Sequence, residues 1–382
     1  MKRVIAAKFK EAQVGYVPDG WVEMPLGDAV DFNPKRKLEK GRLAKYVAMT
    51  DIEPFTKNIR IFKLRNFLGG SKFRNGDTLM ARITPCLENG KTAFVDFLDH
   101  DEIAAGSTEF IVLCGKENVS DSDFVYYLSI NPSLRKAAIK AMTGTSGRQR
   151  VENDKIASFL FQLPSLIEQK QIVKILSSLD DKIELNRKIS VNLEILASTL
   201  FKKWFIDIGD ELPEGWRVTT LKEVLTLNYG KALKAEDRKN GQVKVFGSSG
   251  FIGFHDTKLV DGPGIIVGRK GNVGSVFWSD QDFYPIDTTY FITSELPLTY
   301  CYFLLKTQSF VNGDSVVPGL NRDQAYRTEI FLPNAKILNK FDAIATDLFN
   351  SVASIEKENE KLSSMRDSLL PRLMSGKIRT KI

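Results

Sequence analysis

The feature that most constrains this chain is that it repeats itself. The sequence PDGW at Pro18–Trp21, with a leucine five residues further on, recurs as PEGW at Pro213–Trp216, 195 residues later, again with a leucine five residues on. A Leu-Pro pair that closes an apolar run ends each copy, at Leu163–Pro164 and, 169 residues later, at Leu332–Pro333. The shared frame and the different lengths between its ends predict two similar halves that carry divergent globular inserts.

After each Leu-Pro pair the sequence has a long helical pattern. Apolar and small residues recur with 4-3 spacing over 172–204, and the positions 169 residues later, over 341–373, keep that spacing. Each predicted helix has about 40 residues and a length of about 60 Å. Two matched seams in one chain can pair with each other, and the pseudo-twofold relation of the halves favours the antiparallel sense. We therefore expect an intramolecular antiparallel coiled coil.

Local signals mark the ends of these helices. Ser165 with Glu168 predicts a capping box at the first start, Asn334 predicts an N-cap at the second, and Gly376 predicts a stop. Polar residues also occur inside the seam, where they are expected to set the register of the pair rather than to stabilise it. These residues are Asn186, Ser190 and Asn359.

The regions between the repeated motifs mix strand-like and helix-like patterns, so the predicted fold class is α+β. Strands are expected at Ala44–Met49, Thr92–Val95, Phe110–Leu113, Gly264–Gly268, Val273–Trp278 and Tyr290–Thr293, and helices at Ser122–Ser129 and Leu298–Lys306. The predicted organisation is a first globular domain over 1–163, a helical spacer over 164–207, a second globular domain over 208–332 and a second spacer over 333–382.

Composition limits the chemistry that this chain can perform. Three cysteines, Cys86, Cys114 and Cys301, are too few and too far apart for a disulfide framework or a paired cysteine knuckle. The two histidines, His100 and His255, are expected at the surface, which gives little support to a zinc site or a Ser-His-Asp triad. We expect no bound metal and no catalytic residue.

Two further classes of protein are disfavoured. The triplet Gly90-Lys91-Thr92 suggests a P-loop, but Pro85 stands where that motif requires a glycine. No apolar run approaches the roughly 18 to 20 residues that a membrane-spanning helix needs, so we expect a cytoplasmic protein that does not contact a membrane.

The charge pattern permits a polyanionic partner. The chain has 54 Lys and Arg against 47 Asp and Glu, a net charge of +7, and no segment forms a basic tail. Any contact with nucleic acid must therefore come from clusters on a folded surface. Arg82 and Arg269 follow similar turn-and-strand patterns, 187 residues apart, so we expect them at matching places in the two halves.

Candidate DNA contacts are basic, amide and hydroxyl side chains in turn-like segments, from which they can reach phosphates or base edges. Such charge runs are often only solvated surface, and the glycine-rich Gly268–Gly274 is equally consistent with a plain hairpin turn. The candidates are Lys35, Arg36, Lys72, Arg74, Arg82, Thr84, Asn89, Lys91, Arg148, Arg150, Lys231, Lys234, Arg238, Lys239, Arg269, Lys270, Asn272, Asn321 and Arg322.

At these motifs the sequence resembles the specificity subunit of type I restriction-modification enzymes, over nearly the whole chain. The resemblance rests on the order and double occurrence of short motifs, each weak by itself. They include Pro18–Trp21, Pro213–Trp216, Gly76–Asp77, Ala81–Pro85, Gly90–Thr92, Ser107–Phe110, Gly268–Gly271, Pro318–Asn321, Leu163–Pro164 with Glu168–Lys170, and Leu369–Leu373 with Ser375–Gly376.

The resemblance implies that each globular part is a target recognition domain that reads one half of a bipartite, asymmetric site in double-stranded DNA. The paired helices then set the spacing between the half-sites, and methyltransferase subunits dock on them, near Glu168, Gln169 and Lys170 in the first helix. S-adenosylmethionine, ATP and magnesium belong to the partner methyltransferase and restriction subunits, so this chain is expected to bind no cofactor. The second helix has Ala335–Asn339 in place of the Glu-Gln pair, which leaves open whether both docking faces are equivalent.

Two other hypotheses remain open at the level of sequence. The chain could be a coiled-coil adaptor whose duplicated domains bind proteins. It could also be a nuclease or methyltransferase in its own right, although the Asn-Pro-Pro-aromatic motif of methyltransferases is missing: Asn33-Pro34 continues to Lys35 and Asn131-Pro132 to Ser133.

Overall fold

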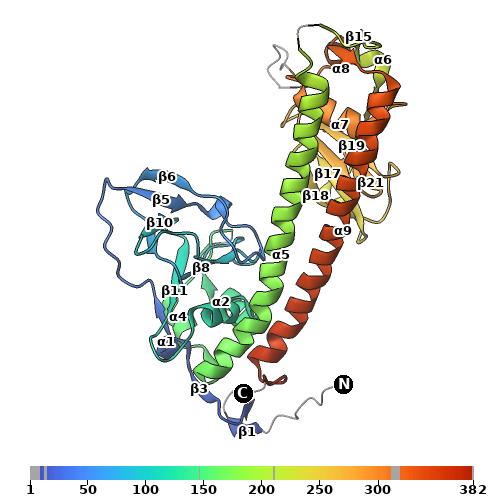
Figure 1. The fold of residues 1–382 in the computed structure, drawn as a ribbon. Helices are drawn as coiled ribbons and strands as arrows, with labels where there is room; N and C mark the ends of the chain where they lie inside the picture. The colour runs from blue at the N-terminus through green and yellow to red at the C-terminus, as the bar shows by residue number, and fades with distance from the viewer. Residues whose placement is uncertain (1–8, 13–14, 146, 210, 311–318, 381–382) are drawn as a thin grey trace. The chain divides into compact units, whose positions relative to one another are not determined.

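The computed structural model describes residues 9–12, 15–145, 147–209, 211–310 and 319–380 (Figure 1). Contacts divide the chain into two compact units. Unit 1 comprises 1–185 and 359–382, and unit 2 comprises 186–358. Each unit therefore contains one globular part together with a portion of each long helix, and we describe the units separately.

Unit 1 contains two four-stranded sheets, with strand orders β6-β5-β10-β7 and β4-β11-β8-β9. The second sheet and helix α2 enclose the main core of the unit, to which Leu79–Ala81 and Phe124–Leu128 contribute buried side chains. Its strands are β1 (Phe9–Ala12), β2 (Gly15–Pro18), β3 (Val22–Pro25), β4 (Val30–Phe32), β5 (Leu43–Val47), β6 (Lys63–Asn66), β7 (Ser71–Phe73), β8 (Thr78–Ala81), β9 (Thr92–Phe94), β10 (Ala104–Gly106), β11 (Phe110–Gly115), β12 (Met142–Thr143), β13 (Arg150–Val151) and β14 (Leu160–Leu163). Its short helices are α1 (Leu26–Ala29), η1 (Met49–Asp51), α2 (Ser122–Ile130), α3 (Pro132–Lys140) and α4 (Asn153–Ala157).

Unit 2 has a four-stranded sheet of order β16-β22-β19-β20 and a three-stranded sheet of order β18-β17-β21. Helix α7 is buried along Thr299–Leu305 and packs into the core beside β19 and β20. The strands are β15 (Arg217–Thr220), β16 (Thr226–Tyr229), β17 (Val243–Gly247), β18 (Gly250–His255), β19 (Gly264–Gly268), β20 (Val276–Ser279), β21 (Phe283–Pro285), β22 (Thr289–Thr293) and β23 (Glu329–Leu332). The short helices are α6 (Leu221–Val224), η3 (Ala235–Asp237), α7 (Leu298–Thr307) and α8 (Arg322–Tyr326).

The two units repeat one another, as predicted. Their four-stranded sheets have the same order when β4, β11, β8 and β9 are aligned with β16, β22, β19 and β20, and all these neighbours are antiparallel. The second sheets share a parallel pair, β5 with β10 and β17 with β21. The α+β prediction is therefore confirmed.

The repeated PxGW motif forms the same turn in both units. The tryptophan amide donates to the proline carbonyl at 3.0 Å for Trp21 and 3.1 Å for Trp216. Gly20 and Gly215 have φ angles of 82° and 78°, a left-handed conformation that glycine adopts without steric penalty. The glycine at the third position of both motifs is explained by the left-handed backbone of this turn.

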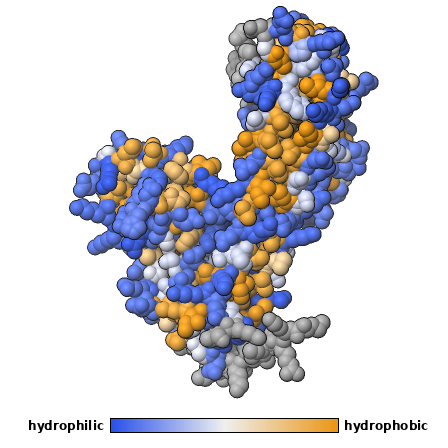
Figure 2. All heavy atoms as spheres, in the orientation of Figure 1, coloured by the Kyte–Doolittle hydropathy of each residue, from blue (hydrophilic) through white to orange (hydrophobic). Residues whose placement is uncertain are grey.

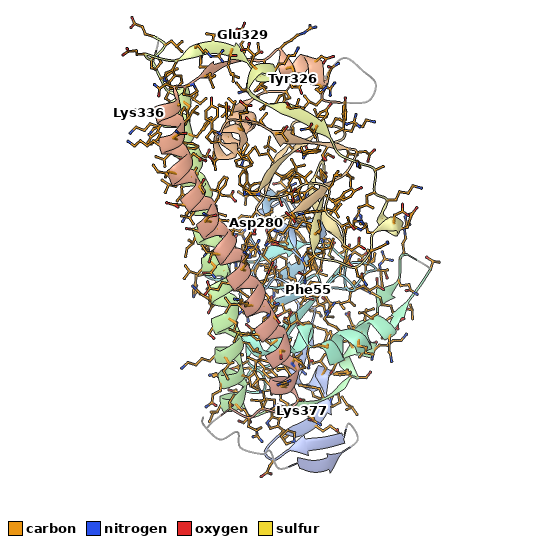
Figure 3. All side chains as sticks on the ribbon, turned by 90° about the vertical axis from the view of Figure 1, so that its right-hand side faces the viewer. Phe55, Asp280, Tyr326, Glu329, Lys336 and Lys377 are labelled. Carbon is orange, nitrogen blue, oxygen red and sulfur yellow. The ribbon has the colours of Figure 1, made fainter. Side chains whose placement is uncertain are left out.

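The long helices are α5 (Leu166–Phe201), which continues into the π-helical turn η2 (Lys202–Ile206), and α9 (Ala335–Met374). In unit 1, Asp180 of α5 contacts Arg366 of α9, and in unit 2 Asn186 contacts Glu358 while Phe201 contacts Phe341. The two helices therefore run antiparallel in each unit, and Figures 1 and 3 show them side by side, with Lys336 near the start of α9 and Lys377 just beyond its end.

Every position of the two predicted seams is buried or half-buried, so the predicted pairing is confirmed. The end signals also hold: Asn334 accepts a hydrogen bond from the Ile337 amide at 3.2 Å, and Gly376, with φ of 67°, follows the end of α9. Only half of the predicted capping box forms. Ser165 accepts from the Glu168 amide at 3.3 Å, but the Glu168 carboxylate binds other residues instead of turning back to the cap.

Two local predictions need correction. His255 is buried rather than at the surface, because its Nδ1 accepts the Lys239 amide at 3.1 Å and its ring lies against Tyr284. The strand predicted from Val273 begins only at Val276, because the preceding residues turn, with the Gly274 amide donating to the Gly268 carbonyl at 2.9 Å. Among the described residues, no helix combines the length and apolarity needed to cross a membrane.

Candidate nucleic-acid interface

Arg82 and Arg269 occupy equivalent positions in the two units. Each follows a fully buried strand, β8 or β19, at the same place in the sheet order. The Arg82 amide donates to the Glu109 carbonyl at 2.9 Å, and its carbonyl accepts from Val151 at 2.9 Å. The Arg269 amide donates to Thr288 at 2.9 Å, and its carbonyl accepts from Leu320 at 2.8 Å. The backbone of each arginine is thus held rigidly at the end of its strand.

In unit 1, Arg82 borders a basic hollow of about 560 Å³. Arg36 lies in its wall, but its guanidinium is paired with Asp77 and its side chain is only 8% exposed. Lys72 donates from Nζ to the Arg36 carbonyl at 3.1 Å. The buried Nε of Arg82 has no hydrogen-bond partner among the described residues. The Nε of Arg36 also lacks a partner, but the Arg36 guanidinium is paired with Asp77, whereas Arg82 forms no ion pair with a described carboxylate. Of the two arginines that line this hollow, Arg82 is therefore the more available to an anion.

The carboxylate of Asp77 organises the same wall. Burial raises its pKa, while the Arg74 amide, which donates at 2.7 Å, and the Arg36 guanidinium lower it. Arg74 contributes this contact through its backbone, and its side chain stays exposed, as does that of Lys35. The structure therefore separates Arg36, held in an internal ion pair, from Lys35 and Arg74, which face solvent.

The segment after β8 carries the remaining candidates of unit 1. Lys91 donates from Nζ to the Met49 carbonyl at 2.7 Å, and Thr84 donates to the Gln149 carbonyl at 3.3 Å. Arg150 grips Glu109 through Nε at 2.9 Å and Nη2 at 2.7 Å, and these hydrogen bonds lower the pKa of the Glu109 carboxyl. Asn89, Arg148 and Arg150 have exposed side chains, but Arg150 is paired with Glu109, so Asn89 and Arg148 are the exposed candidates of this segment without a carboxylate partner among the described residues.

In unit 2, Arg269 is held more tightly than Arg82. Its Nε and Nη2 both donate to the Asp287 carbonyl, at 3.1 and 2.6 Å, and its guanidinium carbon lies 5.2 Å from the ring centre of Tyr229. Arg322, at the start of α8, also lies 5.2 Å from the Tyr229 ring, and its buried Nε has no partner among the described residues. Two cations over one half-exposed tyrosine form the basic centre of unit 2.

Of the neighbouring candidates of unit 2, two have exposed side chains and one caps a helix. Lys270 and Asn272 are exposed in the turn after β19. The side-chain oxygen of Asn321 caps α8, because it accepts hydrogen bonds from the amides of Asp323 and Gln324 at 2.9 and 3.2 Å. In the Pro318–Asn321 motif, Pro318 lies outside the described residues.

A second basic group of unit 2 follows β16. Lys231, Lys234 and Lys239 are exposed, whereas Arg238 donates from Nη1 to the Ile252 carbonyl at 2.7 Å. Within the described part of the chain, no hydrogen bond, ion pair or ring contact joins this group to Arg269. The structure thus brings Arg269 together with Arg322 but not with these four residues.

Sequence reasoning missed Tyr229 and Asn33. Tyr229 is the last residue of strand β16 and stands directly before Gly230. The tyrosine-glycine pair at the end of a strand was the only feature of the sequence that could have indicated it. Asn33 lines the hollow of unit 1 and accepts the Val112 amide at 2.9 Å, with a left-handed φ of 49°. Both residues depend on strand pairing, which the local sequence does not reveal.

The predicted docking residues on α5 have partners within unit 1. The Glu168 carboxylate accepts from Trp21 Nε1 at 2.9 Å and from Arg379 at 2.6 Å. Gln169 is fully buried and bonds the Asp121 amide at 2.8 Å, while Lys170 is exposed. Of the three, only Lys170 offers its side chain to another molecule in this structure.

A more apolar exposed surface lies further along α5, within unit 2. Ile189, Val191, Ile195 and Leu196 are between 38% and 57% exposed. Val191 and Ile195 are one turn apart, and Ile189 and Leu196, two turns apart, lie on another side of the helix. Figure 2 shows hydrophobic surface over this part of unit 2. Exposed apolar patches of this kind mark interaction surfaces. Among the described residues, no group of three or more His, Cys, Asp or Glu side chains is arranged to hold a metal ion.

A family model supplies the identity of this arrangement. The model of the type I restriction modification DNA specificity domain matches residues 18–195 and 213–363, which together cover most of the chain. The chain therefore belongs to this family. It is a specificity subunit of a type I restriction-modification system, a non-catalytic subunit whose place in the complex implies DNA target recognition.

Individual relatives agree over nearly the whole length. The HindI specificity subunit of Haemophilus influenzae is 23% identical over 94% of this chain and 99% of its own length. The MjaVIII specificity subunit of Methanocaldococcus jannaschii is 25% identical over 98% of this chain and 96% of its own. A crystal structure of an S subunit from M. genitalium, 17% identical, covers 97% of this chain and 99% of that one with a TM-score of 0.56, which supports the fold.

Proposed function

We propose that this chain reads an asymmetric site in double-stranded DNA through two half-sites, one for each globular part, and positions methyltransferase and restriction subunits on that site. The segments 1–163 and 208–332 act as the two target recognition domains, and 164–207 and 333–382 act as spacers. S-adenosylmethionine, ATP and magnesium are supplied by the partner subunits.

The observation that carries this proposal is the matched placement of Arg82 and Arg269 in different surroundings. Both lie at the end of the equivalent buried strand. Arg82 faces a hollow bordered by lysines, whereas Arg269 is packed on Tyr229. Equivalent positions with different side-chain neighbours support the reading of two different half-sites, as an asymmetric site requires.

The helices support a spacing role. Half-sites one helical turn apart need reading elements separated by roughly 34 Å. The 36 residues of α5 extend about 54 Å at about 1.5 Å per residue, so the helix is long enough to span that distance.

The exposed apolar side chains of α5 support docking of a methyltransferase subunit. The positions 169 residues after Ile189, Val191, Ile195 and Leu196 are Glu358, Glu360, Ser364 and Met365. Three of these four are polar, so the two helices offer unequal surfaces. We propose that the face on α5 binds its methyltransferase subunit more tightly than the face on α9.

The decisive experiment is expression of this chain with a methyltransferase subunit from the same source, followed by modified-base sequencing of the host DNA. We expect a split motif with a fixed gap that disappears when this chain is omitted.

Arg82→Ala should relax sequence preference in one half of the motif, by about 1–3 kcal/mol for a base contact. Uniform weakening over all sequences would instead identify Arg82 as a phosphate contact.

Lysine substitutions test the electrostatic part of the interface. Lys72→Gln should weaken binding to all duplexes. If Lys72 contacts a phosphate, the substitution should also lower the slope of log affinity against log salt by about 1.

Binding of a partner that is insensitive to nuclease and to salt between about 50 and 200 mM would favour the coiled-coil adaptor instead. Methyl transfer or DNA cleavage by the purified chain alone would contradict the proposal.

A further inference from the structure

The guanidinium of Arg269 is fixed in a way that leaves one defined edge unused. Nε and Nη2 both donate to the Asp287 carbonyl, at 3.1 and 2.6 Å. These two donors occupy one side of the planar guanidinium, so the end that carries Nη1 and the second Nη2 hydrogen has no hydrogen-bond acceptor among the described residues. An arginine end of this kind presents two parallel N–H groups in a fixed fork.

Aromatic packing restricts the plane of the same group. The guanidinium carbon lies 5.2 Å from the ring centre of Tyr229 and 5.9 Å from that of Tyr290. Tyr290 is itself buried, and its hydroxyl donates to the Leu320 carbonyl at 3.1 Å, the residue whose amide bonds the Arg269 carbonyl. Backbone, hydrogen bonds and stacking therefore all restrain Arg269, which removes much of the side-chain entropy that binding would otherwise lose.

No described carboxylate forms an ion pair with Arg269, so its charge is not neutralised by the part of unit 2 that the structure describes. Arg82 also forms no ion pair with a described carboxylate, but its charge acts on Glu109, whose carboxyl pKa is lowered mainly by Arg150 and further by Arg82. Among the described residues, no carbonyl orients the Arg82 guanidinium as that of Asp287 orients Arg269. Two of the candidate arginines of unit 1, Arg36 and Arg150, are instead held by the carboxylates of Asp77 and Glu109. An arginine that is oriented by a neutral carbonyl keeps its full charge and its donors for a ligand.

We infer that Arg269 reads guanine in the major groove, by a bidentate contact of its free fork with the O6 and N7 acceptors. Guanine alone among the bases presents two acceptors side by side on that edge, which match two parallel N–H donors. Arg322 lies over the same tyrosine and adds positive charge beside the contact. This inference rests on the proposed function, and it names the base that unit 2 recognises.

The test uses the full chain in complex with its methyltransferase subunit and a pool of randomised double-stranded DNA. The unaltered complex should enrich a two-part motif with one invariant guanine whose preference is lost in Arg269→Ala. A bidentate base contact corresponds to about 5- to 150-fold discrimination at that position. Arg269→Lys should keep affinity for the pool but lose most of the guanine preference, because a lysine ammonium lacks the planar fork.

A modified duplex separates a base contact from a phosphate contact. Replacing the invariant guanine by 7-deazaguanine removes the N7 acceptor and leaves base pairing intact. The unaltered complex should bind this duplex several-fold more weakly, whereas Arg269→Ala should bind both duplexes equally. Arg217→Ala is the matched control, because Arg217 is an exposed arginine of unit 2 that is paired with Glu223.

Each outcome has a distinct meaning. A motif without a guanine that depends on Arg269, or equal binding of the guanine and 7-deazaguanine duplexes by the unaltered complex, would overturn the guanine contact while leaving two-part recognition intact. Failure of the unaltered complex to enrich any sequence would instead overturn the proposed function itself. Tyr229→Leu should reduce the guanine preference without abolishing it, because the Asp287 carbonyl still orients Arg269.

Discussion

The two units differ in chemistry at a buried position where both long helices meet. In unit 1, Tyr127 donates to Asp180 at 2.7 Å, and Arg366 donates to the other oxygen of Asp180, also at 2.7 Å. The residues 169 positions from Asp180 and Arg366 in the repeat are Phe349 and Ala197, which lie in the apolar core of unit 2. Unit 1 therefore has a buried hydrogen-bonded network of polar side chains at this position, and unit 2 has apolar side chains.

This contrast yields a prediction about stability. Arg366→Ala should destabilise unit 1 by about 3–5 kcal/mol, because it leaves the Asp180 carboxylate buried without its cation. The triple variant Tyr127→Phe, Asp180→Phe, Arg366→Ala copies the chemistry of unit 2 and should recover most of that loss. Denaturant unfolding of the three proteins checks this, and a triple variant less stable than the single one would contradict it.

A buried thiol gives a pH-dependent prediction. Burial raises the pKa of Cys301 to about 11 from its ordinary value of 9.0, while a hydrogen bond to Ser294 works against that shift. Between these values the unfolded thiol is ionised and the folded thiol is not, so the free energy of unfolding falls as the pH rises. The loss should reach roughly 2–3 kcal/mol. Denaturant titrations from pH 8 to 11 measure it, and Cys301→Ala should make the decline shallower. Buried tyrosines such as Tyr300, whose pKa is also raised by burial, contribute the decline that remains.

At the scale of elements, short-range signals were reliable where a helix or turn satisfies its own backbone. Asn334 caps α9 as the sequence indicated, and the strand Gly264–Gly268 and helix Leu298–Thr307 lie where their patterns predicted them. The pairing of strands, by contrast, joins segments far apart in the chain. For this reason the surroundings of Arg82 and Arg269 could not be predicted, although their equivalence could.

The cap of α9 is a testable element. Asn334→Ala should destabilise unit 2 by about 1 kcal/mol, because the Ile337 amide loses its acceptor at the first turn. Asn334→Asp should retain the cap. Hydrogen exchange of the first-turn amides of α9 measures the effect, with the exposed Asn339→Ala as control. Unchanged exchange in Asn334→Ala would show that water replaces the cap.

At the scale of the whole molecule, unit 1 is built from both ends of the described chain. Arg379, beyond α9, donates to the Glu168 carboxylate at 2.6 and 2.9 Å and to the Asp19 carbonyl at 3.1 Å, and its guanidinium lies over Trp21. Glu168 is 2% exposed, and Arg379 and Trp21 donate hydrogen bonds to its buried carboxylate. The repeated PDGW turn and the segment after the second helix are thereby joined.

Loss of this junction should affect one unit only. Arg379→Ala should destabilise unit 1 by about 3 kcal/mol, because a buried carboxylate loses its cation. The neighbouring exposed lysine gives the control variant, Lys377→Ala (Figure 3). Hydrogen exchange reports β3 and β14 separately from β15 and β23, and only the first pair should exchange faster. An equal change in both pairs would show that the units unfold together.

The repeated frame, the α+β class and the antiparallel helix pair could all be predicted from the amino-acid sequence. These features depend on periodicity and on local backbone requirements, such as the glycine of each PxGW turn, which are visible along the chain. Only the tertiary structure decided which basic residues are free to meet a ligand. Arg36 and Arg150 are bound by carboxylates, and Arg269 is oriented by Asp287 and Tyr229. Those partners come from other strands and loops, and burial, charge pairing and orientation exist only after the strands have paired.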